Sequence, residues 1–182
     1  MTEKSRQFEQ IYRDVSRDLY VYIVRSIRND DLAGDILQDS FINFIKAFQE
    51  KDLPPSVNCR MYLFRIARHL MINHSRSSVN KKTTLYSDPD SYVSSSSENL
   101  PESNLMESES RKEVSNFLNE LLSNLSEEEK TAVILKHVHQ MKLAQIAEIL
   151  ETSVSTASRL VQKGMERLSE MADRKGVKLG EF

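Results

Sequence analysis

The chain has 182 residues with only four glycines and four prolines, 39% hydrophobic residues and a formal net charge of −2, which allows one medium hydrophobic core or two small ones. No apolar run approaches the roughly 20 residues of a membrane span, and the first residues lack the apolar core of a signal peptide, so we expect a cytoplasmic protein without membrane insertion. The single cysteine, Cys59, excludes an internal disulfide and a zinc site of several thiolates, and we expect it in the core.

A first helical block is predicted over residues 1–76, and long apolar runs at helical spacing predict an all-α protein. The opening helix of this block has apolar side chains at core spacing: Phe8, Ile11, Tyr12, Val15 and Leu19. A second helix is predicted over residues 35–48, with an inner stripe of Leu37, Phe41, Phe44 and Phe48.

The second helix has another face that is polar and acidic. By the same periodicity Asp35, Gln38, Asp39 and Ile42 share this face, which places an exposed aliphatic side chain beside two carboxylates. Such a patch suits docking to another protein. An ordinary solvated face is the alternative interpretation.

Residues 59–82 form a basic segment with no acid on a chain that is otherwise acidic. On a helix, one face would carry Tyr62, Arg65, His69, Asn73 and Arg76, and the apolar stripe would be Leu63, Ile66, Ala67 and Leu70. A basic stripe on an acidic protein indicates a polyanionic partner. A solvated helix face is again the alternative.

Residues 77–111 are predicted to be a flexible linker. From Thr83 to Ser110 the segment is rich in serine and carries acids but neither lysine nor arginine. It cannot bury enough apolar surface to offset its ordering entropy. It is either a passive tether or an acidic mimic of a nucleic-acid backbone.

A second helical block is predicted over residues 112–175, followed by a tail at 176–182. Ser126 before three acids marks a helix start. Residues 143–168 have the spacing of a helix-turn-helix, with Glu151 at a turn position that favours glycine and Ser153 or Thr152 as the N-cap of the second helix. The outer face of that helix has side chains suited to base edges and phosphates: Ser155, Thr156, Arg159, Gln162 and Lys163. The alternative is an ordinary helical hairpin.

Two of these motifs resemble those of one family. Residues 35–41, DILQDSF, resemble the D-x-x-Q-[DE]-[ST]-F signature of region 2 in bacterial sigma factors, and residues 62–69, YLFRIARH, resemble the W-L-[YF]-x-I-A-R-N run that follows it. The block from Leu121 to Met171 resembles sigma region 4. With these two regions and a short linker, the chain resembles the extracytoplasmic-function (ECF) sigma factors.

The resemblance implies a fold of two small helical domains and a function in transcription initiation. Asp35, Gln38 and Asp39 would dock on the β′ clamp helices of core RNA polymerase, and region 4 would also meet the β flap. The −10 promoter element would be bound by Tyr62, Arg65, Arg68, His69, Asn73 and Arg76. The −35 element would be bound by Ser155, Thr156, Arg159, Gln162 and Lys163. A monomer is expected, and sequestration by an anti-sigma protein is an expectation from the family alone.

Four departures from the family pattern concern the DNA-binding residues. Tyr62 replaces the usual tryptophan, His69 stands where asparagine is common, and Asn73 stands where aspartate is common. The recognition helix reads T-A-S-R-L rather than T-V-K-S-R-L. The promoter sequence therefore cannot be carried over from typical members.

Nothing in the sequence indicates an enzyme, a cofactor or a metal site, because no phosphate loop or nucleophile motif occurs and His137 and His139 are poorly spaced for one metal. Two rival functions stay open. A stand-alone helix-turn-helix regulator leaves the Asp35–Asp39 patch unexplained. A sigma-like decoy that only binds an anti-sigma protein has no need for Arg65, Arg68 and Arg76.

Overall fold

The computed structural model describes residues 3–82, 117–118 and 120–175, and all regular secondary structure in these residues is helical, which confirms the predicted all-α fold. Three helices form the N-terminal unit: α1 (Glu3–Ile27), α2 (Asp30–Phe48) and α3 (Ser56–Lys82). The C-terminal unit contains α5 (Glu127–Val133), the π-helical turn η1 (Ile134–Val138), α6 (Leu143–Leu150) and α7 (Val154–Arg174). No helix in the described ranges is long and apolar enough to cross a membrane.

The N-terminal unit packs its three helices around an aromatic and aliphatic core. Leu19, Tyr22, Ile36, Phe44 and Phe64 have at most 1% of their surface exposed. Removing that apolar surface from water is the main stabilising contribution. Cys59 is buried, as predicted, and the Asn29 side chain accepts a hydrogen bond from the Leu32 amide to cap α2.

Helix caps in the C-terminal unit agree with the sequence analysis. Ser126 and Glu129 form a capping box at the start of α5, and the Ser153 hydroxyl accepts from the Thr156 amide at the start of α7. Glu151 has φ 55° and ψ 45°, which confirms the left-handed turn predicted between α6 and α7. These caps fix where the recognition helix begins.

The C-terminal unit also contains one close helix approach. Gly164 of α7 packs against α5, where a Cβ atom at this position would lie 2.6 Å from Val133 Cγ2. Only a residue without a side chain allows the two helices to approach to this distance. The approach sets the position of α7 relative to α5.

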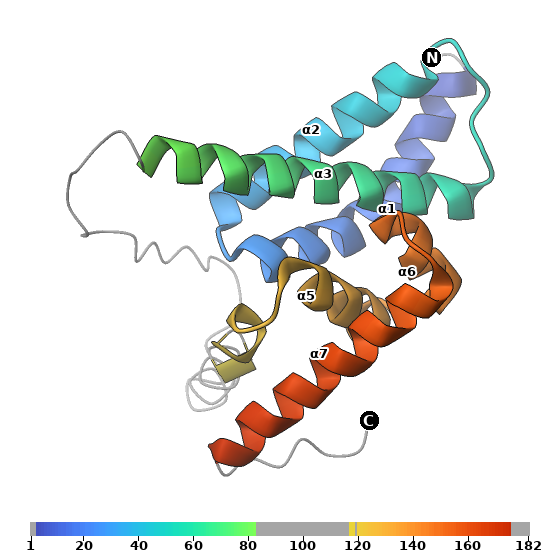
Figure 1. Cartoon of the computed structure of the whole chain (residues 1–182). Coiled ribbons are helices and arrows are strands. Elements are labelled where there is room, and N and C mark those ends of the chain that lie inside the picture. The colour runs from blue at the N-terminus through green and yellow to red at the C-terminus, as the bar shows by residue number, and fades with distance from the viewer. Residues whose placement is uncertain (1–2, 83–116, 119, 176–182) are drawn as a thin grey trace, which may run out of the picture.

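The two units pack against each other, which the sequence did not predict. Figure 1 shows α5, α6 and α7 gathered on one side of the N-terminal helices. Helix α6 packs against α3, and η1 contacts α1. Ile134, Leu135, Met141 and Ile146 join the same buried cluster as the N-terminal core. Helix α3 continues to Lys82, past the expected boundary at Arg76, and most of the expected linker and the tail lie outside the described residues.

Candidate nucleic-acid and protein-docking surfaces

The acidic face of α2 is exposed. Asp35, Gln38 and Asp39 all lie on the surface, and within the described part of the chain they have no hydrogen bond or ion pair with another side chain. Ile42 and Tyr12 extend the face with apolar surface, 38% and 49% exposed, and the Tyr12 ring contacts Phe41 with ring centroids 4.8 Å apart. Uncommitted carboxylates beside exposed apolar groups can bind a basic and apolar protein surface.

Tyr62 is anchored between α2 and α3. Its ring centroid lies 5.2 Å from that of Phe48 and 6.0 Å from that of Phe44, and the Arg65 guanidinium lies 5.0 Å from its ring centroid. Edge-to-face and tilted aromatic contacts, together with a cation over the ring, fix the orientation of the tyrosine. The side chain is half-buried, so part of it faces solvent.

A pocket of about 260 Å³ lies beside Tyr62. It is lined by Asn43, Tyr62, Arg65, Ile66, His69 and Leu70. Aromatic, amide, guanidinium and imidazole groups around an aliphatic floor can stack on a planar ring and donate hydrogen bonds to its edge. Leu63 and Ala67 of the predicted apolar stripe are fully buried, whereas Ile66 and Leu70 form part of this pocket.

Sequence reasoning missed Asn43, because it lies on α2 and joins the pocket only through the packing of α2 on α3. A signal was present, since Asn43 follows Asp39 by four residues and therefore continues the polar face of α2.

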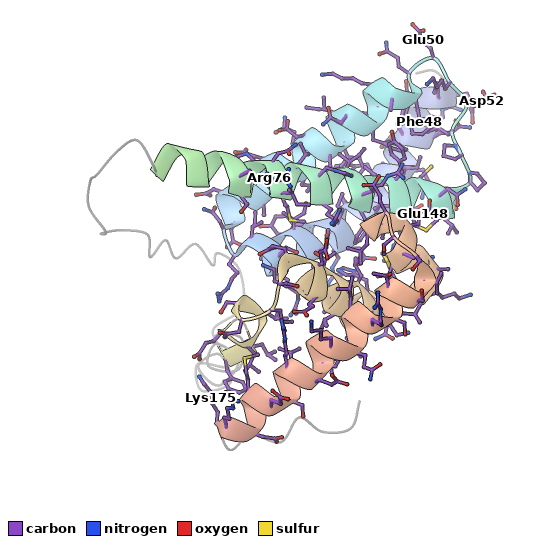
Figure 2. The ribbon with its side chains drawn as sticks, in the orientation of Figure 1. Phe48, Glu50, Asp52, Arg76, Glu148 and Lys175 are labelled. Carbon is purple, nitrogen blue, oxygen red and sulfur yellow. The ribbon has the colours of Figure 1, made fainter. Side chains whose placement is uncertain are left out.

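The basic residues of α3 divide between two surfaces. Arg68 and Arg76 line a cavity of about 740 Å³ between the N-terminal helices and the C-terminal unit, whereas Arg65 lines the pocket beside Tyr62. Asn73 is exposed. Figure 2 shows Arg76 well apart from Phe48, which contacts Tyr62, so the predicted residues from Tyr62 to Arg76 extend along much of α3.

The outer face of the recognition helix is polar and accessible. Ser155, Arg159 and Gln162 are exposed, and Thr156 is half-buried. Arg159 Nη2 donates to Thr156 Oγ1 at 3.4 Å, and Gln162 Nε2 donates to Glu166 Oε1 at 2.9 Å. These local hydrogen bonds orient both side chains without burying them, so both side chains can give up these bonds and form hydrogen bonds to a ligand instead.

Lys163 has a structural partner that the sequence analysis did not identify. Its Nζ lies 3.8 Å from Glu129 Oε1, and Arg167 Nη1 lies 2.5 Å from Glu129 Oε2. Burial alone would raise the pKa of the Glu129 carboxyl, but bonds from Ser126 and the charges of Arg167 and Lys163 together lower it. The ionised carboxylate therefore ties α5 to α7 and helps to position the recognition helix.

No cluster of three or more His, Cys, Asp or Glu side chains that could hold a metal ion occurs among residues 3–82 and the described part of 117–175. His139 is half-buried and His137 is exposed, so the two histidines have different surroundings.

Comparison with known families gives two matches in chain order. The model described as sigma-70 region 2 matches residues 11–80, and the model described as sigma-70, region 4 matches residues 118–168. Together the two matches cover well over half of the chain.

Curated relatives match over nearly the whole length. The chain is 25% identical to the RNA polymerase sigma factor YlaC of Bacillus subtilis, covering 89% of this chain and 90% of the relative. It is 27% identical to the ECF RNA polymerase sigma factor SigW of the same organism, covering 87% of this chain and 83% of the relative. It is 22% identical to the ECF RNA polymerase sigma factor SigM, also from Bacillus subtilis, covering 91% of this chain and 95% of the relative.

Solved structures share the fold. The sigma factor RpoE of Bartonella quintana, in complex with the anti-sigma factor NepR, superposes with a TM-score of 0.66 at 20% identity, covering 92% of this chain and 97% of that one. CnrH, in complex with the cytosolic domain of CnrY, superposes with a TM-score of 0.60 at 20% identity, covering 93% of this chain and 90% of that one.

Proposed function

The chain belongs to the sigma-70 family of RNA polymerase sigma factors, and from this membership we propose that it is an ECF-type sigma factor. It binds core RNA polymerase and directs promoter recognition and melting at the start of transcription. The observation that supports this most strongly is the presence of regions 2 and 4, in order, on one chain that spans most of its ECF relatives. The chain acts in the cytoplasm with the polymerase, which supplies the catalytic chemistry.

The acidic face of α2 is the surface we assign to core polymerase. Asp35, Gln38 and Asp39 are exposed and uncommitted within the described residues, and Ile42 supplies an apolar contact beside them. Charged groups steer association, while a buried apolar contact supplies affinity. The expected counterpart is the pair of β′ clamp helices, and region 4 would meet the β flap.

The −10 element is assigned to the pocket beside Tyr62 and to the basic side chains along α3. Melting requires an unpaired base to be held outside the stack, and a pocket with an aromatic wall and hydrogen-bond donors suits that task. Tyr62, Arg65 and His69 would contact the base. Arg68, Asn73 and Arg76 would contact the strand backbone.

The −35 element is assigned to the exposed face of α7. Arg159 and Gln162 can make bidentate contacts with base edges in the major groove, while Ser155, Thr156 and Lys163 suit phosphates. Lys163 would have to share its charge between Glu129 and DNA. Its replacement therefore affects stability as well as binding.

The experiment that tests the core-binding assignment is complex formation with purified bacterial core polymerase. Asp39→Arg is expected to weaken the complex by at least tenfold, because it places a cation where the partner surface is expected to be basic. Asp14→Arg is the matched control, because it makes the same charge change at an exposed position of α1. Equal affinity of both variants and the wild type would refute this assignment.

The same experiment separates the rival functions. A stand-alone regulator would not bind core polymerase and would bind duplex DNA alone. A decoy for an anti-sigma protein would bind neither the polymerase nor promoter DNA. Both rivals therefore predict that the wild type forms no complex with core.

A further inference from the structure

The cavity of about 740 Å³ that contains Arg68 and Arg76 has more cations on its wall than anions. Five side chains with a permanent positive charge line it: Arg25, Arg28, Arg68, Arg76 and Lys130. The carboxylates among its lining residues are those of Glu127 and Glu128, both on α5. A concave surface lined mainly by one sign of charge concentrates ions of the opposite sign.

Three of these arginines have no neutralising partner in the described part of the chain. Arg25, Arg68 and Arg76 form no hydrogen bond or ion pair with another residue of the described ranges. By contrast, Lys130 Nζ lies 2.9 Å from Glu127 Oε1, and Arg60 Nη2 lies 2.8 Å from Asp18 Oδ2. Like charges gathered in a cavity repel one another more strongly than charges in open water, so an anion bound among them would be stabilised.

Helix α3 presents the cavity with a charged stripe that has an apolar centre. Arg68, Met71, Ile72 and Arg76 all line the cavity and follow one another at steps of three, one and four residues, which places them on one broad face of the helix. At 1.5 Å per residue, the two arginines are about 12 Å apart along the helix axis. Leu122 adds apolar surface from the C-terminal unit.

The chemistry of the wall favours phosphate groups. A guanidinium group is planar and donates two parallel hydrogen bonds to a phosphate, which makes arginine a preferred residue for this anion. A chain of phosphates carries several negative charges within a short length, so several arginines can bind it at once. The cavity volume lies within the range of small-molecule sites, roughly 300–1,000 Å³.

We propose that this cavity is a binding site for a small molecule with a chain of two or more phosphate groups. The phosphates bind the arginines, and an organic part, where the ligand has one, packs on the apolar side chains between them. Nucleoside polyphosphates and inorganic polyphosphate both carry such a chain. The site goes beyond the proposed function and does not depend on it.

A ligand in this cavity would also affect DNA binding. Arg68 and Arg76 line the cavity, and the same two side chains are assigned above to the strand backbone at the −10 element. One guanidinium group cannot give its hydrogen bonds to both anions, so the ligand and the strand compete. This consequence, unlike the site itself, rests on the proposed function.

Isothermal titration calorimetry of the full chain tests the site, with ATP, inorganic triphosphate and AMP as the probes. ATP is expected to bind with one-to-one stoichiometry and about tenfold more tightly than AMP, because AMP lacks the chain of phosphates. Triphosphate that binds as tightly as ATP would assign the site to the phosphate chain alone, whereas weaker binding of triphosphate would assign part of the affinity to the nucleoside. Absence of saturable binding of both ATP and triphosphate would overturn the proposal.

Charge reversal locates the binding in this cavity. Arg25→Glu is expected to lower the affinity for ATP about tenfold or more, because it replaces a cation of the wall with an anion. Arg17→Glu is the matched control, since it makes the same change at an exposed position of the same helix that does not line the cavity. Equal affinities of the two variants would overturn the proposal. If circular dichroism shows that Arg25→Glu has lost helix, Arg76→Glu decides by the same comparison.

The competition is tested with a fluorescent single-stranded oligonucleotide of mixed sequence. Saturating ATP is expected to weaken oligonucleotide binding to the wild type about tenfold relative to sodium chloride at the same ionic strength. An effect of ATP no larger than that of the salt would overturn the competition. Oligonucleotide binding that Arg25→Glu weakens, with no ATP binding to the wild type, would assign the cavity to the DNA strand and overturn the small-molecule site. These measurements need neither polymerase nor promoter, so their failure is distinct from a failure of the proposed function.

Discussion

Gly164→Ala tests how closely α7 must approach α5. In an ordinary helix this change would stabilise by about 0.5–1 kcal/mol, because alanine loses less backbone entropy on folding. Here the added Cβ would lie 2.6 Å from Val133 Cγ2, and the branched valine, itself only 6% exposed, has little freedom to turn away. Overpacking of this kind costs about 1–3 kcal/mol. The net expectation is a destabilisation of about 1 kcal/mol.

Thermal unfolding followed by circular dichroism measures this change, and the chain offers a control. Gly34 lies within α2 with nothing within 4 Å of its added Cβ, so Gly34→Ala is expected to stabilise. Gly164→Ala is expected to lower the melting temperature by about 2–4 °C. Val133→Ala removes the clashing methyl, so the double variant should be less destabilised than the sum of the single ones. A Gly164→Ala variant as stable as Gly34→Ala would refute the close approach.

Three further changes probe the recognition helix and its support. Arg167→Met leaves Lys163 as the cation beside the buried Glu129 carboxylate and should cost about 2 kcal/mol in urea unfolding. Because the pKa of Glu129 is lowered, this cost should be present above pH 4.5 and should disappear as the pH falls below that value. A cost that persists in acid would contradict this. Ser153→Ala removes the N-cap of α7 and should lower the free energy of unfolding by about 1 kcal/mol. An unchanged melting curve would contradict this. Arg159→Ala should weaken binding to promoters that depend on the −35 element by about 1–3 kcal/mol, measured as a loss of transcription from them. Transcription from promoters without that element should not change.

Much of the fold followed from local patterns in the sequence. The capping box at Ser126, the left-handed turn at Glu151 and the cap at Ser153 each depend on a few neighbouring residues, so spacing alone located them. The same holds for the exposed acidic face of α2, because helical periodicity separates it from the buried stripe.

The packing of the two units could not be predicted in this way. Phe64 and Met71 lie off the predicted apolar stripe of α3, and both are buried at 0% and 8% exposure. Helical periodicity shows which side chains must be buried but not which distant segment of the chain packs over them. His139 follows a π-helical turn, which shifts the helical register and removes the spacing from which its direction could have been judged.

The candidate site shows the same division between local and tertiary information. Tyr62, Arg65 and His69 were predicted from one helix and do line one pocket, whereas Asn43 comes from another helix. Arg68 and Arg76 were assigned to the same DNA surface, yet they line the cavity between the units, which exists only once both units are placed. Residues that meet through tertiary packing leave no fixed spacing in the sequence.

Run-off transcription with purified bacterial core polymerase on a library of promoter fragments is the most direct test of sigma activity. We expect promoter-dependent transcripts with the wild-type chain and with Asp14→Arg, and their loss with Asp39→Arg. Absence of wild-type transcripts across the library, together with no detectable complex between the chain and core polymerase, would contradict assignment as a working sigma factor.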